Sequence, residues 1–196
     1  MNFLAHAHLA GGPKEFTVGS VVGEYVKGSA TSNLPLLFGS GVKHHRLIDV
    51  YTDQHDFVVS YKGRVDKRYR RYCGIVLDIY CDYLLIQNWG SFCDESVDGF
   101  IAKLYRGILE HSWRVPDKYQ LILNTLVEDD WLSSYSSIDG ICSAVQRIEK
   151  RLGRDVGLEH LLNSMHSDEE LKSSFVPFYS DLSIYAVDQK RILINQ

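Results

Sequence analysis

The chain lacks the features that mark several large classes of protein. Its 196 residues hold only four cysteines, at positions 73, 81, 93 and 142, and these form no CxxC pair. That spacing excludes a zinc ribbon and is typical of free thiols in a reducing compartment. No apolar run approaches the roughly 18 residues of a membrane span, and the opening MNFLAHAHLAGG has no basic signal-peptide region. We expect a cytoplasmic protein with no membrane partner.

Positive charge is also scarce. The formal net charge is −4, with 23% charged and 45% hydrophobic residues, as in an ordinary globular chain. This balance argues against a nucleic-acid partner, because nucleic-acid phosphates select basic surfaces. One basic run stands out, KGRVDKRYRR at residues 62–71. Such a run is usually a solvated helix face, and the alternative is a docking surface for an acidic partner.

Strand signals are missing as well. No convincing alternating run or hairpin dipeptide occurs, whereas apolar residues recur at helical spacing along most of the chain. Residues 97–109, 121–126, 138–152 and 171–185 show this rhythm. The pattern predicts an all-α protein, a single compact multi-helix domain over residues 1–196 with seven to nine helices. Residues 28–35 (GSATSNLP) are the clearest loop.

The chain does contain a concentration of metal-type side chains at residues 44–56, HHRLIDVYTDQHD. His45, Asp49, Asp53 and Asp56 recur at spacings of four, four and three, which places them on one helical face. Imidazole and carboxylate groups on one face are what a hard or borderline divalent cation requires. The alternative is a hydrogen-bonded ion network that links helices.

Three further segments carry polar groups among apolar residues. His6 and His8 point about 160° apart on a helix, so at most one faces a site, and either is alternatively a hydrogen-bonded core residue. Glu24 is the only acid in VGSVVGEYVKG, and the alternative to a role in a site is that it caps a helix or lies on the surface. Asp78 and Asp82 lie four apart in an apolar helix, where carboxylates must be paired, hydrogen-bonded or metal-bound.

These segments together supply imidazoles and carboxylates from four separate helices. The predicted donors are His6, Glu24, His45, Asp49, Asp78 and Asp82. This mixture suits manganese or magnesium, either of which polarises phosphoryl oxygens and lowers the pKa of bound water. Arg46 would then clamp a phosphate oxygen. The residues indicate metal-assisted phosphoester hydrolysis.

Four ordered motifs resemble those of bacterial acyl carrier protein phosphodiesterases. They are NFLAHAHLA (2–10), GSVVGEYVKG (19–28), HRLIDVYTD (45–53) and LDIYCDYLL (77–85), with Trp89 following. The resemblance is close over residues 1–90 and looser beyond, where it includes residues 128–131. It implies a rearranged, all-helical relative of HD-domain phosphohydrolases. It also implies hydrolysis of the phosphodiester that joins 4′-phosphopantetheine to a serine of holo-acyl carrier protein, with a divalent cation and manganese favoured.

The resemblance also implies roles for individual residues. We expect His6, Glu24, His45, Asp49 and Asp78 to bind the metal, and Arg46, Asp49 and Asp82 to act in catalysis. Three positions depart from the family pattern. Glu24 replaces the usual aspartate, while Tyr83 and Lys43 stand where some members have histidine. Because tyrosine is a poor ligand or base at neutral pH, a weaker metal site, another substrate and an active subfamily variant all stay open.

The resemblance finally implies an acidic protein partner, because acyl carrier proteins are small and strongly acidic. A cationic patch near the site would steer such a partner. The candidate docking residues are Arg64, Lys67, Arg68, Arg70 and Arg71. Two other functions stay open: a helical protein that has another substrate or only binds acyl carrier protein, and a generic nucleotide phosphohydrolase. The sequence indicates no particular oligomeric state.

Overall fold

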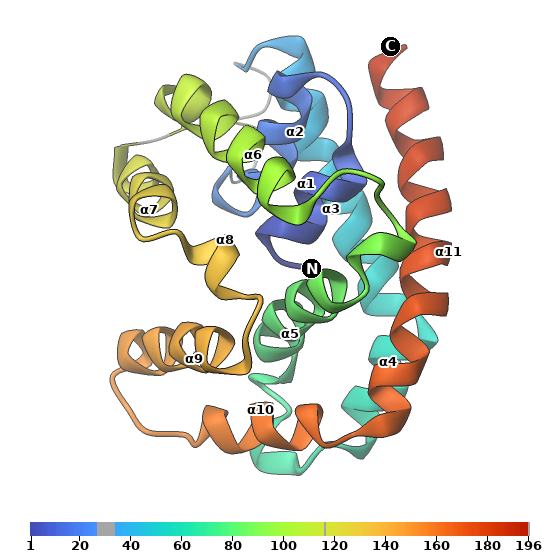
Figure 1. Ribbon diagram of the computed structural model, residues 1–196, viewed down its shortest axis with the longest axis vertical. Helices are drawn as coiled ribbons and strands as arrows, with labels where there is room; N and C mark the ends of the chain where they lie inside the picture. The colour runs from blue at the N-terminus through green and yellow to red at the C-terminus, as the bar shows by residue number, and fades with distance from the viewer. Residues whose placement is uncertain (27–33, 116, 196) are drawn as a thin grey trace.

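The computed structural model describes residues 1–26, 34–115 and 117–195, and within them the chain forms helices and no strand (Figure 1). The predicted all-α class is confirmed. The described residues form eleven α-helices, so the expectation of seven to nine is wrong. The reason is that the shortest helices, such as α8 (Trp131–Ser134), hold too few residues to show a period. Residues 28–33 of the expected loop lie outside the described residues.

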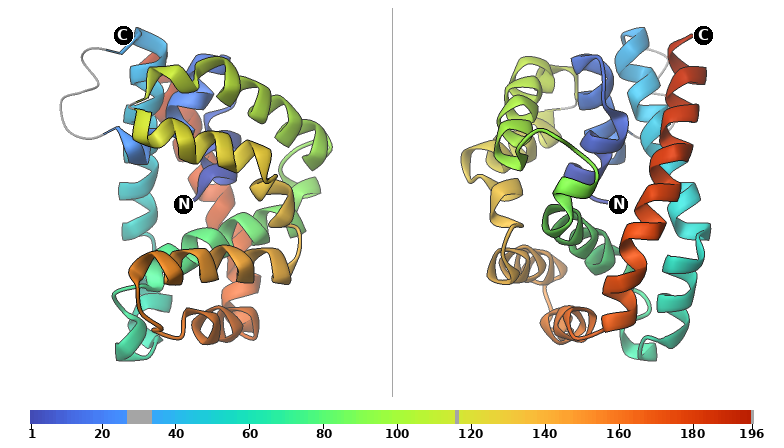
Figure 2. Two further views of the ribbon diagram at one scale, coloured as in Figure 1. Left: turned by 90° about the vertical axis from the view of Figure 1, so that its left-hand side faces the viewer. Right: turned by 45° about the vertical axis from the view of Figure 1, so that its right-hand side comes forward.

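The helices follow one another with short connections. The first half contains α1 (Phe3–Ala10), α2 (Lys14–Val21), η1 (Gly23–Tyr25), α3 (Leu36–Gln54), α4 (Asp56–Arg64), η3 (Lys67–Tyr69), α5 (Cys73–Gln87) and η4 (Trp89–Ser91). The second half contains α6 (Val97–His111), η5 (Ser112–Arg114), α7 (Asp117–Glu128), α8, α9 (Ile138–Leu152), α10 (Leu158–His166) and α11 (Glu169–Ile194). The long α11 runs beside α3 and α4 along one side of the molecule (Figures 1 and 2).

Helices α1 and α5 lie at the centre of the core. Every residue of α1 except His8 is buried, and the amino terminus lies in the middle of the molecule (Figure 1). Helix α5 buries residues on nearly all its sides, including Val76, Leu77, Ile79 and Tyr80. A helix that is apolar all round is stable only when neighbours cover it, and here α1, α9, α10 and α11 do so.

Helices α2 and α3 approach each other too closely for side chains at two glycines. A Cβ atom on Gly41 would lie 2.1 Å from the carbonyl oxygen of Phe16, and one on Gly19 would lie 2.2 Å from that of Phe38. Only glycine permits such backbone contact. The close approach brings the end of α2 against the middle of α3, where His45 lies.

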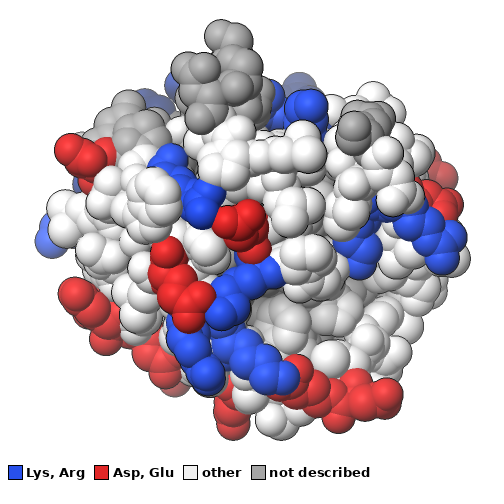
Figure 3. Space-filling model, turned by 90° about the horizontal axis from the view of Figure 1, so that it is seen from above, with Lys and Arg blue, Asp and Glu red and all other residues white. Residues whose placement is uncertain are grey.

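The surface is mixed in charge at the end of the molecule that lies uppermost in Figure 1. Figure 3 shows basic and acidic side chains side by side on that face. Ion pairs also join neighbouring elements, such as Lys14 of α2 with Glu110 of α6 at 2.7 Å. Exposed pairs of this kind contribute at most about 1 kcal/mol to stability. No helix in residues 1–26, 34–115 and 117–195 combines the length and apolarity needed to span a bilayer.

Candidate functional site

Three predicted metal ligands meet where α1 lies against α3. The Nε2 atom of His6 is 3.1 Å from Oδ1 of Asp49, and Nε2 of His45 is 3.0 Å from Oδ2 of Asp49. The two imidazole rings stack with their centroids 3.8 Å apart. One ligand atom from each residue lies within 4.8 Å of the other two. We call these three residues the His–Asp cluster.

The orientation of His45 is fixed by the backbone of α2. Its Nδ1 atom lies 2.8 Å from the carbonyl oxygen of Ser20, which can only accept a hydrogen bond, so Nδ1 carries the proton. In the neutral ring, Nε2 then presents a lone pair to the carboxylate of Asp49. Two facing acceptors require a proton or a cation between them. The donor set of the His–Asp cluster therefore fits a divalent cation, with the imidazole orientation held by a backbone carbonyl.

The protonation states suit ligation too. Burial, assisted by the neighbouring His45, lowers the pKa of His6 to about 3, so His6 is neutral at pH 7. Burial alone would raise the pKa of Asp49, but its close contacts with His45 and His6 and the nearby amino group of Met1 outweigh burial and hold that pKa well below its usual range. Neutral imidazole and ionised carboxylate are the forms that bind metal.

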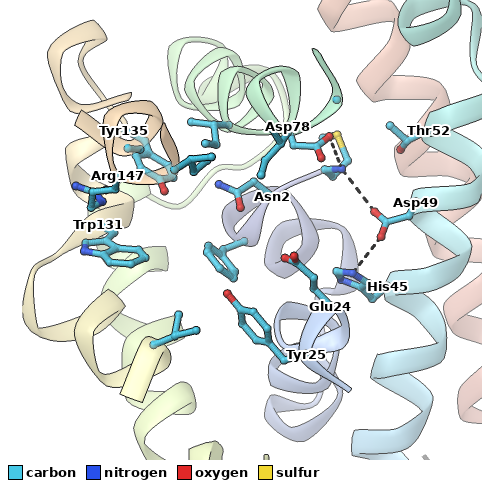
Figure 4. A pocket seen from close by; sticks show the side chains of 18 of the residues that line it. Asn2, Glu24, Tyr25, His45, Asp49, Thr52, Asp78, Trp131, Tyr135 and Arg147 are labelled. Atoms are coloured by element: carbon cyan, nitrogen blue, oxygen red, sulfur yellow. Dashed lines mark hydrogen bonds and ion pairs between the residues drawn. The ribbon is translucent and has the colours of Figure 1, made fainter. Parts of the chain in front are cut away.

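The 3-10 turn η1 covers the His45 ring. A Cβ atom on Gly23 would lie 2.4 Å from Cγ of His45, so a side chain there would displace the imidazole. The next residue, the exposed Glu24, points toward the same cavity beside His45 (Figure 4). Glu24 lies outside the His–Asp cluster itself. In the sequence, a glycine in this small, apolar stretch indicates close packing or a loop near a ligand, and Gly23 does pack closely against His45.

Asp78 faces the cluster from α5. Its Oδ1 atom accepts a hydrogen bond of 2.9 Å from the amino group of Met1, which also lies 3.5 Å from Oδ1 of Asp49. Burial disfavours this ammonium, yet attraction to Asp78 and Asp49 outweighs burial and raises its pKa to about 11. The two carboxylates thus stabilise a positive charge between them.

Asp82 has a different environment. It is fully buried, and its two oxygens accept hydrogen bonds from the backbone N–H groups of Leu4 and Ala5, at 3.0 and 2.9 Å. Burial raises its pKa to about 7 although these hydrogen bonds oppose the shift. The residue at the N-cap of α1, Asn2, makes no side-chain cap bond. Asp82 therefore accepts the hydrogen bonds of backbone N–H groups in the first turn of the helix that carries His6.

The remaining predicted residues of α3 lie apart from the cluster. Arg46 donates from Nη2 to the carbonyl oxygen of Val26 at 2.7 Å. Asp53 is exposed and pairs with Lys62 at 2.9 Å. The expected helical face does not reach Asp56, because α3 ends at Gln54 and the following residue is extended. Asp56 instead opens α4.

Tyr83 and Lys43 stand where some family members have histidine, and neither replacement removes a residue of the His–Asp cluster. The ring of Tyr83 packs on Tyr80, with centroids 5.6 Å apart, and on His166 of α10, at 5.8 Å. Lys43 is exposed on α3. Of the two N-terminal histidines, His6 joins the cluster, whereas Nδ1 of His8 lies 3.0 Å from the hydroxyl of Tyr179.

The basic run joins α4 to α5. Arg64 forms ion pairs with Asp168, at 3.1 Å, and with Glu170, so its charge is largely neutralised. The other four candidate docking residues, Lys67, Arg68, Arg70 and Arg71, are exposed. Arg68 also lies 3.6 Å from Asp66. Lys62, the first residue of the run, and Gly74, just after its end, both line the cavity beside the cluster.

That cavity has a volume of about 550 Å³ and is bounded by helices from both halves of the chain. His45, Asp49 and Asp78 line one end (Figure 4). Trp131, Tyr135, Arg147 and Ile148 line the opposite side and form what we call the α8–α9 wall. Asn2, Glu24 and Tyr25 lie between the two ends (Figure 4), and Phe3 also lines the cavity. A concave space of this size, with polar groups converging at one end, is typical of a small-molecule site.

Helices that bring two imidazoles and a carboxylate to one end of a cavity define an all-α hydrolase scaffold with the donor set of a metal site. The family model described as acyl carrier protein phosphodiesterase matches residues 1–182. The chain therefore belongs to the acyl carrier protein phosphodiesterase family. As a member of it, the chain is a phosphodiester hydrolase.

Curated relatives agree along nearly the whole length. The acyl carrier protein phosphodiesterase of Yersinia enterocolitica is 30% identical over 97% of this chain and 100% of its own. The enzyme of Photorhabdus laumondii is 28% identical, and the match covers 96% of this chain and 94% of the relative. The enzyme of Serratia proteamaculans is 25% identical, and the match covers 97% of this chain and 100% of the relative. No solved structure matches the chain. The expected likeness to HD-domain phosphohydrolases stays a prediction.

Proposed function

We propose that this protein removes 4′-phosphopantetheine from holo-acyl carrier protein, and that residues 1–196 form one catalytic domain. The observation that carries the proposal is the His–Asp cluster at the end of a cavity, in a chain of the acyl carrier protein phosphodiesterase family. In the reaction, a bond forms between water oxygen and phosphorus, the bond from phosphorus to the serine oxygen breaks, and that oxygen leaves with a proton.

The residues of the site divide into ligands and groups that position them. His6, His45 and Asp49 would hold a divalent cation, with manganese preferred to magnesium because two of the three donors are imidazole nitrogens. Such a cation, when bound, supplies Lewis-acid polarisation of the phosphoryl oxygens and acidifies water. Asp78 and Glu24 line the same cavity, so their carboxylates complete the ligand set or orient water.

Two residues expected in catalysis are proposed to act at a distance from the phosphate. Asp82 holds the first turn of α1, and through it His6, by accepting hydrogen bonds from Leu4 and Ala5. Arg46 holds the chain after η1 through the carbonyl of Val26. Both contacts hold the residues of the His–Asp cluster in position, and neither places the side chain at the reacting atoms.

A second proposal concerns the partner and compartment. Acyl carrier protein would dock on the exposed part of the basic run, whose residues are Lys67, Arg68, Arg70 and Arg71. In the sequence these residues lie between Lys62 and Gly74, which both line the cavity. We place the reaction in the cytoplasm, because all four cysteines are free thiols.

The test uses purified protein, manganese and holo-acyl carrier protein, with the carrier's mass as the measurement. We expect wild type to remove the prosthetic-group mass. Asp49→Ala should lose at least about a hundredfold in rate, since it removes a cluster ligand, whereas the exposed control Asp188→Ala should retain full rate. Manganese should also raise the melting temperature of wild type more than that of Asp49→Ala.

Two outcomes would favour the other functions. An unchanged carrier mass, together with no bound metal in elemental analysis, supports a non-catalytic or altered-substrate protein. Release of phosphate from a nucleotide panel, with an unchanged carrier, supports a generic nucleotide phosphohydrolase. A fully active, folded Asp49→Ala variant would remove Asp49 from the site.

A further inference from the structure

The cavity extends well beyond the groups that can touch a phosphate. The His–Asp cluster occupies one end, and the α8–α9 wall faces it across the cavity (Figure 4). In that wall the guanidinium carbon of Arg147 lies 4.6 Å from the ring centroid of Trp131. Ile148 and Ile122 add apolar surface to the lining of the cavity. The hydrolysis of the phosphodiester does not itself require contact with these residues.

We propose that the α8–α9 wall binds the pantetheine arm of the substrate and that Trp131 and Arg147 determine specificity for it. The inference rests on the proposed function. When the phosphate lies at the His–Asp cluster, the carrier protein stays on the open side, and the arm must run along the cavity. The far wall is then the surface that the arm contacts.

The chemistry of the wall matches that of the arm. Beyond its phosphate the arm is uncharged and consists of methyl groups, a hydroxyl, amides and a thiol. Aromatic faces and apolar side chains cover methyl and amide planes, while a guanidinium donates hydrogen bonds to amide carbonyls. Tyr135 is 3% exposed, and burial raises the pKa of its phenol to about 12, so it remains a neutral hydrogen-bonding group.

The size and depth of the space favour this occupant over a protein segment. A cavity of about 550 Å³ lies within the range of small-molecule sites. A folded carrier protein would cover the rim without entering. The wall is also built from regular helices of the second half of the chain, so it is distinct from the basic run between α4 and α5.

Two variants test the wall and two matched variants serve as controls. Arg147→Gln changes an exposed side chain on α9, so the fold should tolerate it. Trp131→Ala removes the half-buried indole. The controls are Arg191→Gln, on the exposed end of α11, and Trp113→Ala, whose side chain is 65% exposed on η5. Each protein is assayed on holo-acyl carrier protein and on bis(p-nitrophenyl) phosphate, and its affinity for pantetheine is measured by calorimetry.

We expect both wall variants to lose about tenfold or more in kcat/KM for holo-acyl carrier protein and in pantetheine affinity. Their turnover of the small diester should stay within about twofold of wild type, as should every measurement on the controls. Equal losses on both substrates, or wild-type values for both wall variants, would overturn the inference. If wild type leaves the carrier intact, the proposed function fails, and pantetheine affinity alone then decides the wall's role.

Discussion

At the scale of single residues, Gly23 sets how closely η1 covers His45. Because a Cβ atom there would lie 2.4 Å from the imidazole Cγ, one methyl group must move the ring or the turn. The ring has little freedom, since its other side stacks on His6 at 3.8 Å and its Nδ1 is bound to Ser20. The glycine therefore acts on the geometry of the cluster without contacting a ligand atom of it.

Gly23→Ala should lower activity on holo-acyl carrier protein and manganese affinity by roughly ten- to a hundredfold, the usual effect of disturbing a group that orients a metal ligand. Gly63→Ala is the control, because a Cβ atom there meets nothing within 4 Å. Kinetics and metal titration provide the measurements, with circular dichroism to confirm folding. Wild-type metal affinity in a folded Gly23→Ala protein would contradict the expectation.

The sequence predicts some of these residues and hides others. The i, i+4 spacing of His45 and Asp49 needs only helix geometry, and the structure brings both to His6. Glu24 and Asp78 lie in the same cavity, but their distance from the cluster depends on how η1 and α5 pack. The proposed roles of Trp131 and Arg147 depend on how α8 and α9 pack around the cavity, and that is a tertiary property with no local signal.

At the scale of elements, Asp82 determines where α1 begins. Its oxygens satisfy the amides of Leu4 and Ala5, which are otherwise buried without a side-chain cap. Sequence reasoning correctly required a partner for a carboxylate in so apolar a helix. The catalytic role expected for Asp82 comes from the family resemblance and stays a prediction. The sequence could not identify the amides of Leu4 and Ala5 as its partners, because backbone amides carry no side-chain signature.

Asp82→Ala should destabilise the protein by about 1–3 kcal/mol per amide left unsatisfied and weaken manganese binding through His6.

Stability should also depend on pH through this residue. Its folded pKa of about 7 exceeds the ordinary aspartate pKa of 3.8, so between these values the native state binds more protons than the unfolded state. The unfolding free energy contributed by Asp82 therefore falls as pH rises from about 4 to 7.

Asp82→Asn isolates the pH dependence, because the amide occupies nearly the same volume and does not titrate. Its single carbonyl oxygen replaces only one of the two acceptors, and that loss is the same at every pH in this range. Urea unfolding of wild type and Asp82→Asn across this pH range should give a stability difference that shrinks toward pH 7. A difference that stays constant with pH would show that Asp82 is ionised in the native protein throughout.

At the scale of the whole molecule, charge placement matters more than net charge. The chain carries a net charge of −4, yet four exposed basic residues gather between the cavity-lining positions Lys62 and Gly74. Arg64, which the sequence alone groups with them, is paired with Asp168 and Glu170 from the α10–α11 region. Such long-range pairing has no trace in the local sequence, so the sequence alone cannot distinguish Arg64 from the other candidate docking residues.

Reversing two charges tests the docking surface. Arg68→Glu/Arg71→Glu should lower kcat/KM for holo-acyl carrier protein about tenfold at low salt and weaken its salt dependence. Lys103→Glu/Arg106→Glu changes the net charge equally on exposed positions of α6 and should leave both quantities nearly unchanged. Equal effects of the two pairs would indicate bulk charge and eliminate a localised docking surface.

The central position of α1 has a further consequence. His6 belongs to a helix whose residues are nearly all buried, and this helix is tied by Asp82 to α5 and by the His–Asp cluster to α3. The cluster is thus assembled from two helices, α1 and α3, that meet only when the core closes. If the cluster binds a cation as proposed, cation affinity and cooperative folding are coupled quantities. A partially unfolded chain that releases α1 would lose His6 from the site, and saturating cation would favour the fully closed core.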